Sequence, residues 1–360
     1  MQKHHRLRLA LLVPVIAAST AFTAPAQAQI SDVARATSST NLGMKYVGTS
    51  ASEDVRVTLA GSTYTLDANA PIQAGAGCSP VAGDATKVTC LAPKVSGIPK
   101  QFSILPTGGA DTVRNLTNAP MYAYGSAGND HLVGSANAAD ELMGASGDDT
   151  VRDTGGENVL DGGTDDDVLL GGEYNDALDG GKGDDRLDGG LGWDRFDGGP
   201  GADDIDGGVD GTDVATIERH DLVDYGDRTV SVFVDLQVTG AQGEQGENDT
   251  LRGIEHVRGG KGHDVLTGNA AVNHLFGNAG NDVISGMRGR DVLNGEEGGD
   301  ILFPSPAAGE VFPTPIADGE ADIMDCGLFG FDNDGEPGDI ALRVVADADF
   351  VSDCPSVFDY

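Results

Sequence analysis

Aspartates that directly follow glycine-rich turns are the residues of this sequence best suited to chemistry. Residues 180–188 read Gly-Gly-Lys-Gly-Asp-Asp-Arg-Leu-Asp, and similar segments recur along much of the chain. Ca²⁺ prefers about six to eight oxygen ligands, drawn from carboxylates and backbone carbonyls. A glycine-rich turn followed by aspartate offers both kinds of oxygen. Two such turns in register could surround an ion that one turn cannot, so repeats n and n+2 are predicted to share calcium.

The repeat has a period of nine residues. In these copies the eighth position is always apolar, which is the position that a solenoid needs to fill its core. The fixed period and the unbroken apolar position argue against a flexible linker or a disordered acidic tract. The copies begin at residues 125, 134, 144, 153, 162, 171, 180, 189, 198, 207, 259, 268, 277, 286 and 295. The apolar residues are Leu132, Leu142, Val151, Leu160, Leu169, Leu178, Leu187, Phe196, Ile205, Leu266, Leu275, Ile284, Leu293 and Leu302.

Composition narrows the class of protein further. The chain has 54 Gly, 58 acidic and 22 basic residues, so its formal net charge is −36. This charge repels nucleic acid and anionic lipid and attracts cations, so nucleic-acid binding is excluded and metal ions are the natural counter-charge. Aromatic residues make up only 5%, so the core must consist of repeated aliphatic side chains, as in a solenoid.

The N-terminal segment has the pattern of a secretory signal peptide. Basic residues precede an apolar run from Leu9 to about Ala18, and Ala26-x-Ala28 follows, which predicts cleavage after Ala28 and a secreted, extracellular product. The alternative is a membrane anchor, but the run is shorter than the roughly 20 residues of a spanning helix. We therefore expect no transmembrane segment in the mature chain.

The four cysteines form an even set, as expected of a chain folded in an oxidising compartment. Three pairings are possible. We favour Cys78 with Cys90 and Cys326 with Cys354, because each pair lies in its own segment at opposite ends of the repeats. A four-cysteine metal site is the alternative, and no Cys-x-x-Cys spacing supports it.

The repeats divide the chain into segments of different character. Strand-like alternation before the repeats indicates a cap over the open end of a repeat stack. A strand and an acidic loop interrupt the repeats once. The predicted segments are the signal peptide at 1–28, an N-terminal β cap at 29–124, a first calcium array at 125–207, a strand-and-loop insertion at 208–258, a second array at 259–303 and a disulfide-bearing C-terminal cap at 304–360.

The pattern Gly-Gly-x-Gly-x-Asp-x-(Leu/Ile/Val/Phe)-x resembles the haemolysin-type, or repeats-in-toxin (RTX), calcium-binding repeat. The resemblance implies an all-β fold, a right-handed parallel β-roll with two nonapeptides per coil and several Ca²⁺ ions along both rows of turns. The Gly77-Cys78 loop and the C-terminal tail resemble exported haemolysin-type proteins of actinobacteria. The implied metal ligands at position six are Asp130, Asp140, Asp149, Asp167, Asp176, Asp185, Asp194, Asp203, Asp264, Asp282, Asp291 and Asp300.

Several repeats depart from the pattern. Asn158 and Asn273 stand at position six, which removes a charge and keeps an oxygen. Asp165, Tyr174 and Asp210 replace the glycine at position four, and Met287 and Glu296 replace the second glycine. We expect distorted or empty sites beside these residues, and roughly 6 to 11 bound ions in total.

Catalysis is not expected from this sequence. It contains no His-Glu-x-x-His and no Gly-x-Ser-x-Gly. His220 and His256, with Asp221, Asp224 and Glu255, could be imagined as an acid-base group of an RTX-associated hydrolase or epimerase, but their spacing does not require it.

The charge pattern predicts how calcium acts. Stacked carboxylates oppose folding without metal, so calcium outside the cell would couple binding to folding. We therefore expect a secreted calcium-binding protein whose repeats form a calcium-dependent scaffold. The alternative is an adhesion or interaction module with a cell-surface or polysaccharide partner, for which Trp193 and Tyr174 are candidate contacts.

Overall fold

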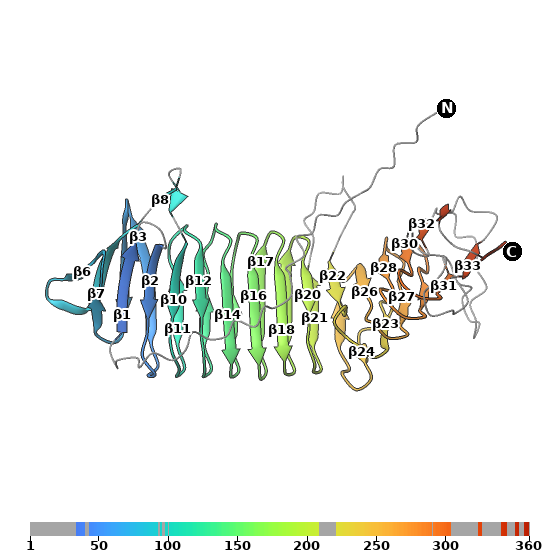
Figure 1. Cartoon of the computed structure of the whole chain (residues 1–360), viewed down its shortest axis with the longest axis horizontal. Helices are drawn as coiled ribbons and strands as arrows, with labels where there is room; N and C mark the ends of the chain where they lie inside the picture. Colours follow the sequence, from blue (N-terminus) through green and yellow to red (C-terminus); the bar gives the residue numbers. More distant parts are fainter. Residues whose placement is uncertain are drawn as a thin grey trace, which may run out of the picture.

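The computed structural model describes residues 34–39, 43–92, 94–95, 98–99, 101–208, 221–289 and 291–303, and four short strands between residues 323 and 359. The predicted signal peptide and the predicted Cys326–Cys354 pair lie outside the described residues. Strands are the regular elements of the described part, and they stack side by side into an elongated array (Figure 1). In that part of the chain, no helix is long and apolar enough to cross a membrane.

Parallel strands two repeats apart form the body of the molecule. β16 (Val159–Thr164) pairs with β18 (Ala177–Lys182), and β17 (Val168–Glu173) pairs with β19 (Arg186–Leu191). Paired residues such as Leu160 and Leu178 are 18 positions apart. One coil therefore contains two nonapeptides, and successive repeats alternate between two sheets. This confirms the predicted parallel β-roll.

The two sides of the roll differ in continuity. One side is a single sheet, and the other consists of two successive sheets. The continuous sheet contains β34 (Phe350–Ser352), β32 (Ile323–Asp325), β30 (Val292–Asn294), β28 (His274–Phe276), β26 (His256–Arg258), β22 (Leu222–Asp224), β20 (Arg195–Asp197), β18, β16, β14 (Glu141–Ser146), β12 (Met121–Tyr124), β10 (Phe102–Leu105), β2 (Gly43–Val47), β1 (Ala34–Ser39) and β5 (Ile72–Ala74) in spatial order.

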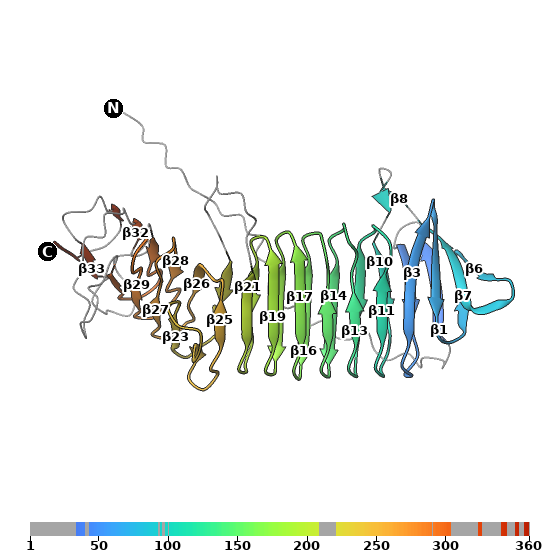
Figure 2. The ribbon, with the colours of Figure 1, turned by 180° about the vertical axis from the view of Figure 1, so that it is seen from behind.

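The other side carries the remaining strands, seen from behind in Figure 2. Its first sheet contains β25 (Thr250–Arg252), β21 (Asp204–Gly208), β19, β17, β15 (Thr150–Arg152), β13 (His131–Val133), β11 (Thr112–Asn115), β3 (Asp54–Ala60), β4 (Thr63–Ala68), β7 (Asp84–Leu91) and β6 (Cys78–Val81). Its second sheet contains β24 (Gly243–Glu244), β23 (Val232–Asp235), β27 (Val265–Thr267), β29 (Val283–Ser285), β31 (Ile301–Phe303), β33 (Ile340–Arg343) and β35 (Ser356–Asp359). β8 (Lys94–Val95) and β9 (Ile98–Pro99) form a separate pair.

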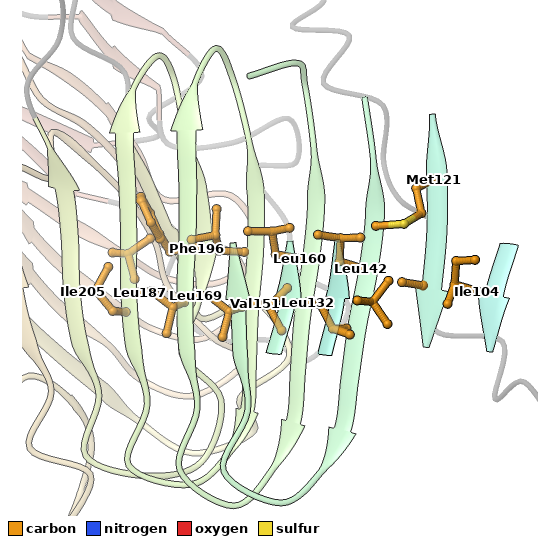
Figure 3. Close-up of a cluster of buried hydrophobic side chains, with 14 of the residues drawn as sticks. Ile104, Met121, Leu132, Leu142, Val151, Leu160, Leu169, Leu187, Phe196 and Ile205 are labelled. Carbon is orange, nitrogen blue, oxygen red and sulfur yellow. The ribbon is translucent and has the colours of Figure 1, made fainter. Parts of the chain in front are cut away.

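Two facing rows of apolar side chains, one from each side of the roll, fill its interior. Position eight of the repeats points inward, and the residues there are at most 2% exposed. Figure 3 shows the row with Leu142, Leu160 and Phe196 from one sheet, opposite the row from Leu132 to Ile205 from the other. Burial of each such side chain contributes about 1.5–3 kcal/mol. The predicted aliphatic core is thus confirmed. Because this core is thin, the stability of the roll also depends on the interactions within the turns.

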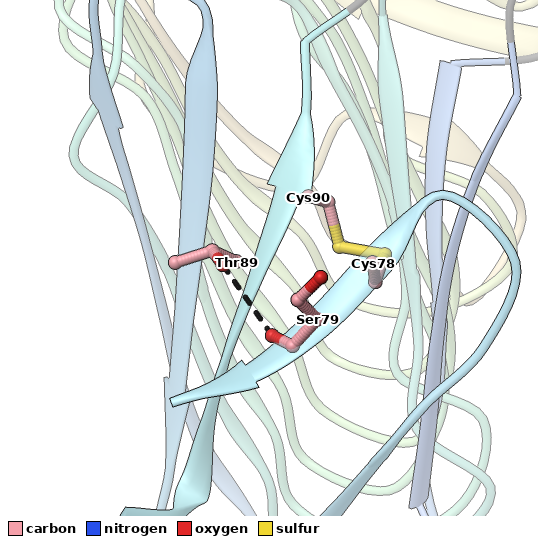
Figure 4. Close-up of a disulfide and its surroundings, with 4 residues drawn as sticks. All are labelled: Cys78, Ser79, Thr89 and Cys90. Carbon is pink, nitrogen blue, oxygen red and sulfur yellow. Dashed lines mark hydrogen bonds between the residues drawn. A yellow bond between two sulfur atoms is a disulfide. The ribbon is translucent and has the colours of Figure 1, made fainter. Parts of the chain in front are cut away.

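The N-terminal strands extend the roll and then close it. β2 pairs in parallel with β10, and β3 pairs in parallel with β11. Beyond them β4, β7 and β6 pair in antiparallel order. The Tyr64 and Phe102 rings pack with their centroids 5.2 Å apart. A disulfide joins Cys78 to Cys90 across β6 and β7 (Figure 4), which confirms that predicted pair.

The segment between the two arrays supplies strands to both sides of the roll. β22 pairs with β20 and with β26, so the continuous sheet passes through this segment. On the other side β25 follows β21, whereas β23 precedes β27. The first sheet of that side therefore ends at β25, and the second begins at β23 with the antiparallel partner β24.

Candidate calcium-binding turn rows

Two rows of turns connect the strands along the edges of the roll (Figures 1 and 2). We call the turns that lead into β13, β15, β17, β19 and β21 row one, and those that lead into β14, β16, β18 and β20 row two. The same alternation recurs in the second array before β27 to β31. Each turn ends at position six of its repeat, and the next residue begins the strand. The position-six residues of one row are therefore neighbours along the roll.

The position-six aspartates of a row form a ladder. In row one Asp130 N donates to Asp149 Oδ1, Asp149 N to Asp167 Oδ1 and Asp167 N to Asp185 Oδ1, each at 2.7 Å. In row two Asp176 N donates to Asp194 Oδ1 at 2.8 Å. One carboxylate oxygen of each aspartate thus ties its turn to the preceding coil of the same row.

In many of these aspartates, the second carboxylate oxygen accepts no hydrogen bond. The Oδ2 atoms of Asp130, Asp149, Asp167, Asp176, Asp185 and Asp203 are buried and have no hydrogen-bond partner. Burying a carboxylate oxygen without a partner costs at least about 1–3 kcal/mol. A cation at that oxygen would remove the cost, so the residues present fit the calcium that their sequence implies.

The glycine at position one makes room for that oxygen. A Cβ added to Gly180 would lie 2.6 Å from Asp185 Oδ2 and 2.5 Å from the carbonyl oxygen of Gly198. A Cβ on Gly171 would lie 2.6 Å from Asp176 Oδ2 and 2.8 Å from the Gly189 carbonyl. We call this small space, which a side chain would fill, a cradle. A carboxylate and a carbonyl from successive coils of one row face it, and these are the oxygens that Ca²⁺ prefers.

Burial changes the protonation of the position-six carboxyls. Burial first, and neighbouring carboxylates second, raise the pKa of Asp149, Asp167 and Asp176 to about 7 and that of Asp203 to about 8, although backbone N–H hydrogen bonds oppose the rise. The metal-free roll therefore holds protons on these carboxyls up to about neutral pH, whereas a bound divalent cation would favour the carboxylate.

All twelve predicted ligands are described, and each is at most 3% exposed. In the structure these aspartates are neighbours only within a row, where each lies next to the position-six residue two repeats before or after it in the sequence. Among the described residues, no group of three or more His, Cys, Asp or Glu side chains is arranged to hold a metal ion. Any site in the rows would therefore depend on backbone carbonyls in addition to carboxylates.

The repeats that depart from the pattern at position four have a different turn. Asp165 and Tyr174 have φ angles of 79° and 77°, whereas Gly183 and Gly192 at the same position of later repeats have 148° and 143°. These two replacements therefore change the backbone of the turn.

The other departures have smaller structural consequences. Met287 and Glu296 have φ angles of 68° and 66°, in the left-handed region that favours glycine. Asn158 stands in the ladder, where its Oδ1 accepts the Asp140 N–H at 2.9 Å.

Three further aspartates occupy the position-six register, although the period of nine does not reach them. Asp111 N donates to Asp130 Oδ1, Asp194 N to Asp221 Oδ1, and Asp203 N to Asp249 Oδ1. Each stands two residues before a buried apolar residue, namely Val113, Val223 and Leu251. That Asp-x-apolar spacing is the signal that could have identified them.

At the junction of the arrays, the protein itself supplies the groups that face Asp249. The Tyr225 hydroxyl donates to Asp249 Oδ2 at 2.9 Å. The Arg228 guanidinium donates to Glu247 at 3.1 Å and to the carbonyl of Gly199, and it lies 5.9 Å from the Tyr225 ring centroid. The carboxylates of this turn are therefore partly compensated by a hydroxyl and a fixed positive charge.

The residues imagined as an acid-base group have structural contacts. Asp224 forms an ion pair with Arg195 at 2.8 Å. The buried His256 accepts the His274 N–H at its Nδ1, and the two rings lie 4.3 Å apart. His220 lies outside the described residues.

The fold and the turn rows define a parallel β-roll of nonapeptide repeats with aspartate-lined turns. The model of the RTX calcium-binding nonapeptide repeat matches residues 122–138, 143–173, 170–205, 246–282 and 267–302. The chain therefore carries RTX calcium-binding repeats, as its sequence indicated, and these repeats support Ca²⁺ binding. A comparison with curated proteins found no match.

Proposed function

We propose that the chain is a secreted, non-enzymatic scaffold whose roll folds when Ca²⁺ enters the turn rows. The observation that supports this most directly is the set of buried Oδ2 atoms without hydrogen-bond partners in Asp130, Asp149, Asp167, Asp176, Asp185 and Asp203. The twelve position-six aspartates would supply carboxylate ligands, and the turn glycines would supply carbonyls.

The low stability of the metal-free roll follows from its charge and its thin core. Folding without metal requires these carboxyls either to take up protons or to repel one another as carboxylates at short range, and one apolar residue per strand offsets this cost only in part. Extracellular calcium modules bind at about 10⁻⁴ to 10⁻³ M. A chain with this affinity would stay unfolded in its repeats during export and would fold on reaching millimolar calcium outside the cell.

Isothermal titration calorimetry of the chain from residue 29 onward tests calcium binding. We expect several ions per chain, an affinity near the millimolar range and proton release at neutral pH, because the buried carboxyls must lose their protons. A chain that binds no calcium, or one ion only, contradicts the proposal.

Export is tested separately, by expressing the full chain in a secreting host. We expect the product in the medium to begin at Gln29. A product that stays in the cell, or keeps residues 1–28, argues against a secreted protein.

An adhesion role is a second candidate, and an exposed aromatic pair favours it. Tyr174 and Trp193 are 58% and 55% exposed on successive turns of row two, and Leu191 beside them is 42% exposed. Trp193 N donates to Asn175 Oδ1 at 3.0 Å, which holds the two turns together. Flat aromatic faces beside acidic turns suit a polysaccharide or cell-surface partner. Pull-down of cell-wall polysaccharide by the calcium-loaded chain, but not by a Trp193→Ala/Tyr174→Ala variant, would support this role.

A further inference from the structure

The repeat at residues 153–158 departs from its neighbours at two positions. Asp153 stands at position one, where the next five repeats have glycine, and Asn158 stands at position six, where they have aspartate. A carboxylate is thus lost from one position of the turn and gained at another. Row two therefore has the same number of acidic residues here as a regular repeat would provide.

Asp153 directs its carboxylate into the cradle of the preceding coil. A Cβ added to Gly134 would meet Asp153 Oδ2 first and would lie 2.7 Å from Asp140 Oδ2. In the cradles of Gly171 and Gly180, the oxygen in the place of Asp153 Oδ2 is a glycine carbonyl. The Gly134 cradle is therefore faced by two carboxylates.

Both carboxylates are buried, and one has an open oxygen. Asp140 is 2% exposed and Asp153 is 3% exposed. Asp153 Oδ1 accepts the Gly155 N–H at 3.1 Å, whereas Asp153 Oδ2 is buried without a hydrogen-bond partner. Two converging carboxylates in a buried space repel each other unless a cation or a shared proton lies between them, and a divalent cation compensates both charges.

Asn158 does not supply a second oxygen at its own position. Its Oδ1 accepts the Asp140 N–H at 2.9 Å, as the Oδ1 of an aspartate does in other repeats. Its Nδ2 donates to the Gly156 carbonyl at 3.0 Å, within the same turn. The amide therefore keeps the ladder hydrogen bond and replaces the open oxygen by a donor, which repels a cation.

We propose that the Gly134 cradle is a Ca²⁺ site that differs from the other cradles, because two carboxylates, those of Asp140 and Asp153, form it. Asp153, at the opposite end of the turn, supplies the negative charge that is missing because position six is Asn158. The site rests on the proposed calcium binding of the rows, and it adds a ligand position that the nonapeptide pattern does not contain.

Ion counting by native mass spectrometry of the calcium-loaded chain tests the site. Asp153→Asn is expected to bind one ion fewer than the wild type. Glu157→Gln removes a charge from an exposed position of the same turn and is expected to bind the wild-type number. An Asp153→Asn variant with the wild-type number of ions and unchanged affinities would overturn the proposal.

A double variant guards against a simple folding defect. Asp153→Gly/Asn158→Asp restores a regular repeat, in which Asp140 and the new aspartate each face a glycine cradle, and is expected to bind at least the wild-type number of ions. A double variant that folds in calcium and still binds one ion fewer contradicts the exchange of roles between the two positions. A wild-type chain that binds no ions at all would instead overturn the calcium binding on which the site rests.

Discussion

The Tyr225 hydroxyl donates a 2.9 Å hydrogen bond to Oδ2 of Asp249, the aspartate that follows Asp203 in the row-one ladder. In Asp185 and Asp203 the equivalent oxygen is buried and has no such partner. The end of the first array is therefore held by side chains from the junction, and we expect its last turn to depend less on calcium than the turns before it.

Replacing Tyr225 by phenylalanine should destabilise the calcium-loaded roll. The change leaves Asp249 Oδ2 buried without its donor, which costs about 1–3 kcal/mol. Urea denaturation in saturating calcium measures the free energy of unfolding. Tyr124→Phe, at a partly exposed tyrosine, is the matched control and should change it little. Equal effects of the two variants would show that the Tyr225–Asp249 hydrogen bond does not stabilise the junction.

Removing one position-six charge should weaken calcium binding. Asp185→Asn takes a carboxylate from a cradle, and the loss of a charged contact of about 1–3 kcal/mol corresponds to a loss of affinity of roughly 5- to 150-fold. Asp184→Asn alters the exposed neighbour and should leave the affinity nearly unchanged. Calcium titration followed by circular dichroism compares the two midpoints, and a shift as large in Asp184→Asn would argue that only net charge matters.

Filling a cradle with one methyl group should also impair the roll. In Gly180→Ala the new Cβ would lie 2.5 Å from the Gly198 carbonyl oxygen and 2.6 Å from Asp185 Oδ2. Such overpacking costs about 1–3 kcal/mol, and it should raise the calcium concentration needed for folding. Gly240→Ala has no atom within 4 Å of its Cβ and serves as control. If Gly180→Ala folds at the wild-type calcium concentration, the cradle has room that the structure does not show.

Without calcium, the roll should lose stability as the pH rises. Burial raises the folded-state pKa of Asp149 and Asp167 to about 7 and that of Asp203 to about 8, whereas aspartate in an unfolded chain titrates near pKa ~3.9. The folded state therefore holds protons that the unfolded state releases. This stabilisation is fully present below about pH 4 and is lost as the pH rises through about 6 to 8.

Circular dichroism in calcium-free buffer measures this dependence. More β-structure at pH 5 than at pH 8 is expected, and saturating calcium should restore the structure at pH 8. A calcium-free chain that gains structure as the pH rises would show that the carboxyls are not proton-bound in the roll.

The sequence alone was sufficient to predict the regular part of the fold. A strict nine-residue period, with glycine in the turn and one apolar residue per strand, predicts stacked coils, and the resemblance to the RTX repeat implies two nonapeptides per coil. Together they predict Leu160 over Leu178 and Asp167 over Asp185. The Cys78–Cys90 pair could be chosen because each cysteine pair lies in its own segment.

The junction and the exchange at Asp153 could not be predicted in the same way. Asp203 and Asp249 are 46 residues apart in the sequence and adjacent in the ladder, so spacing gives no guide to their contact. Arg228 reaches a carbonyl 29 residues earlier, and a lone arginine carries no pattern. In the sequence, Asp153 is only a replacement of the glycine at position one. Its closeness to the Asp140 carboxylate becomes apparent in the structure alone. These features arise from tertiary packing of segments with different lengths.

The central claim is that calcium in the turn rows folds the repeats. Far-ultraviolet circular dichroism of the chain from residue 29 onward, in excess chelator and in about 5 mM Ca²⁺ at neutral pH, tests it most directly. The account predicts a largely disordered spectrum in chelator and a strong, reversible gain of β-structure on adding calcium. The same β content under both conditions would contradict it.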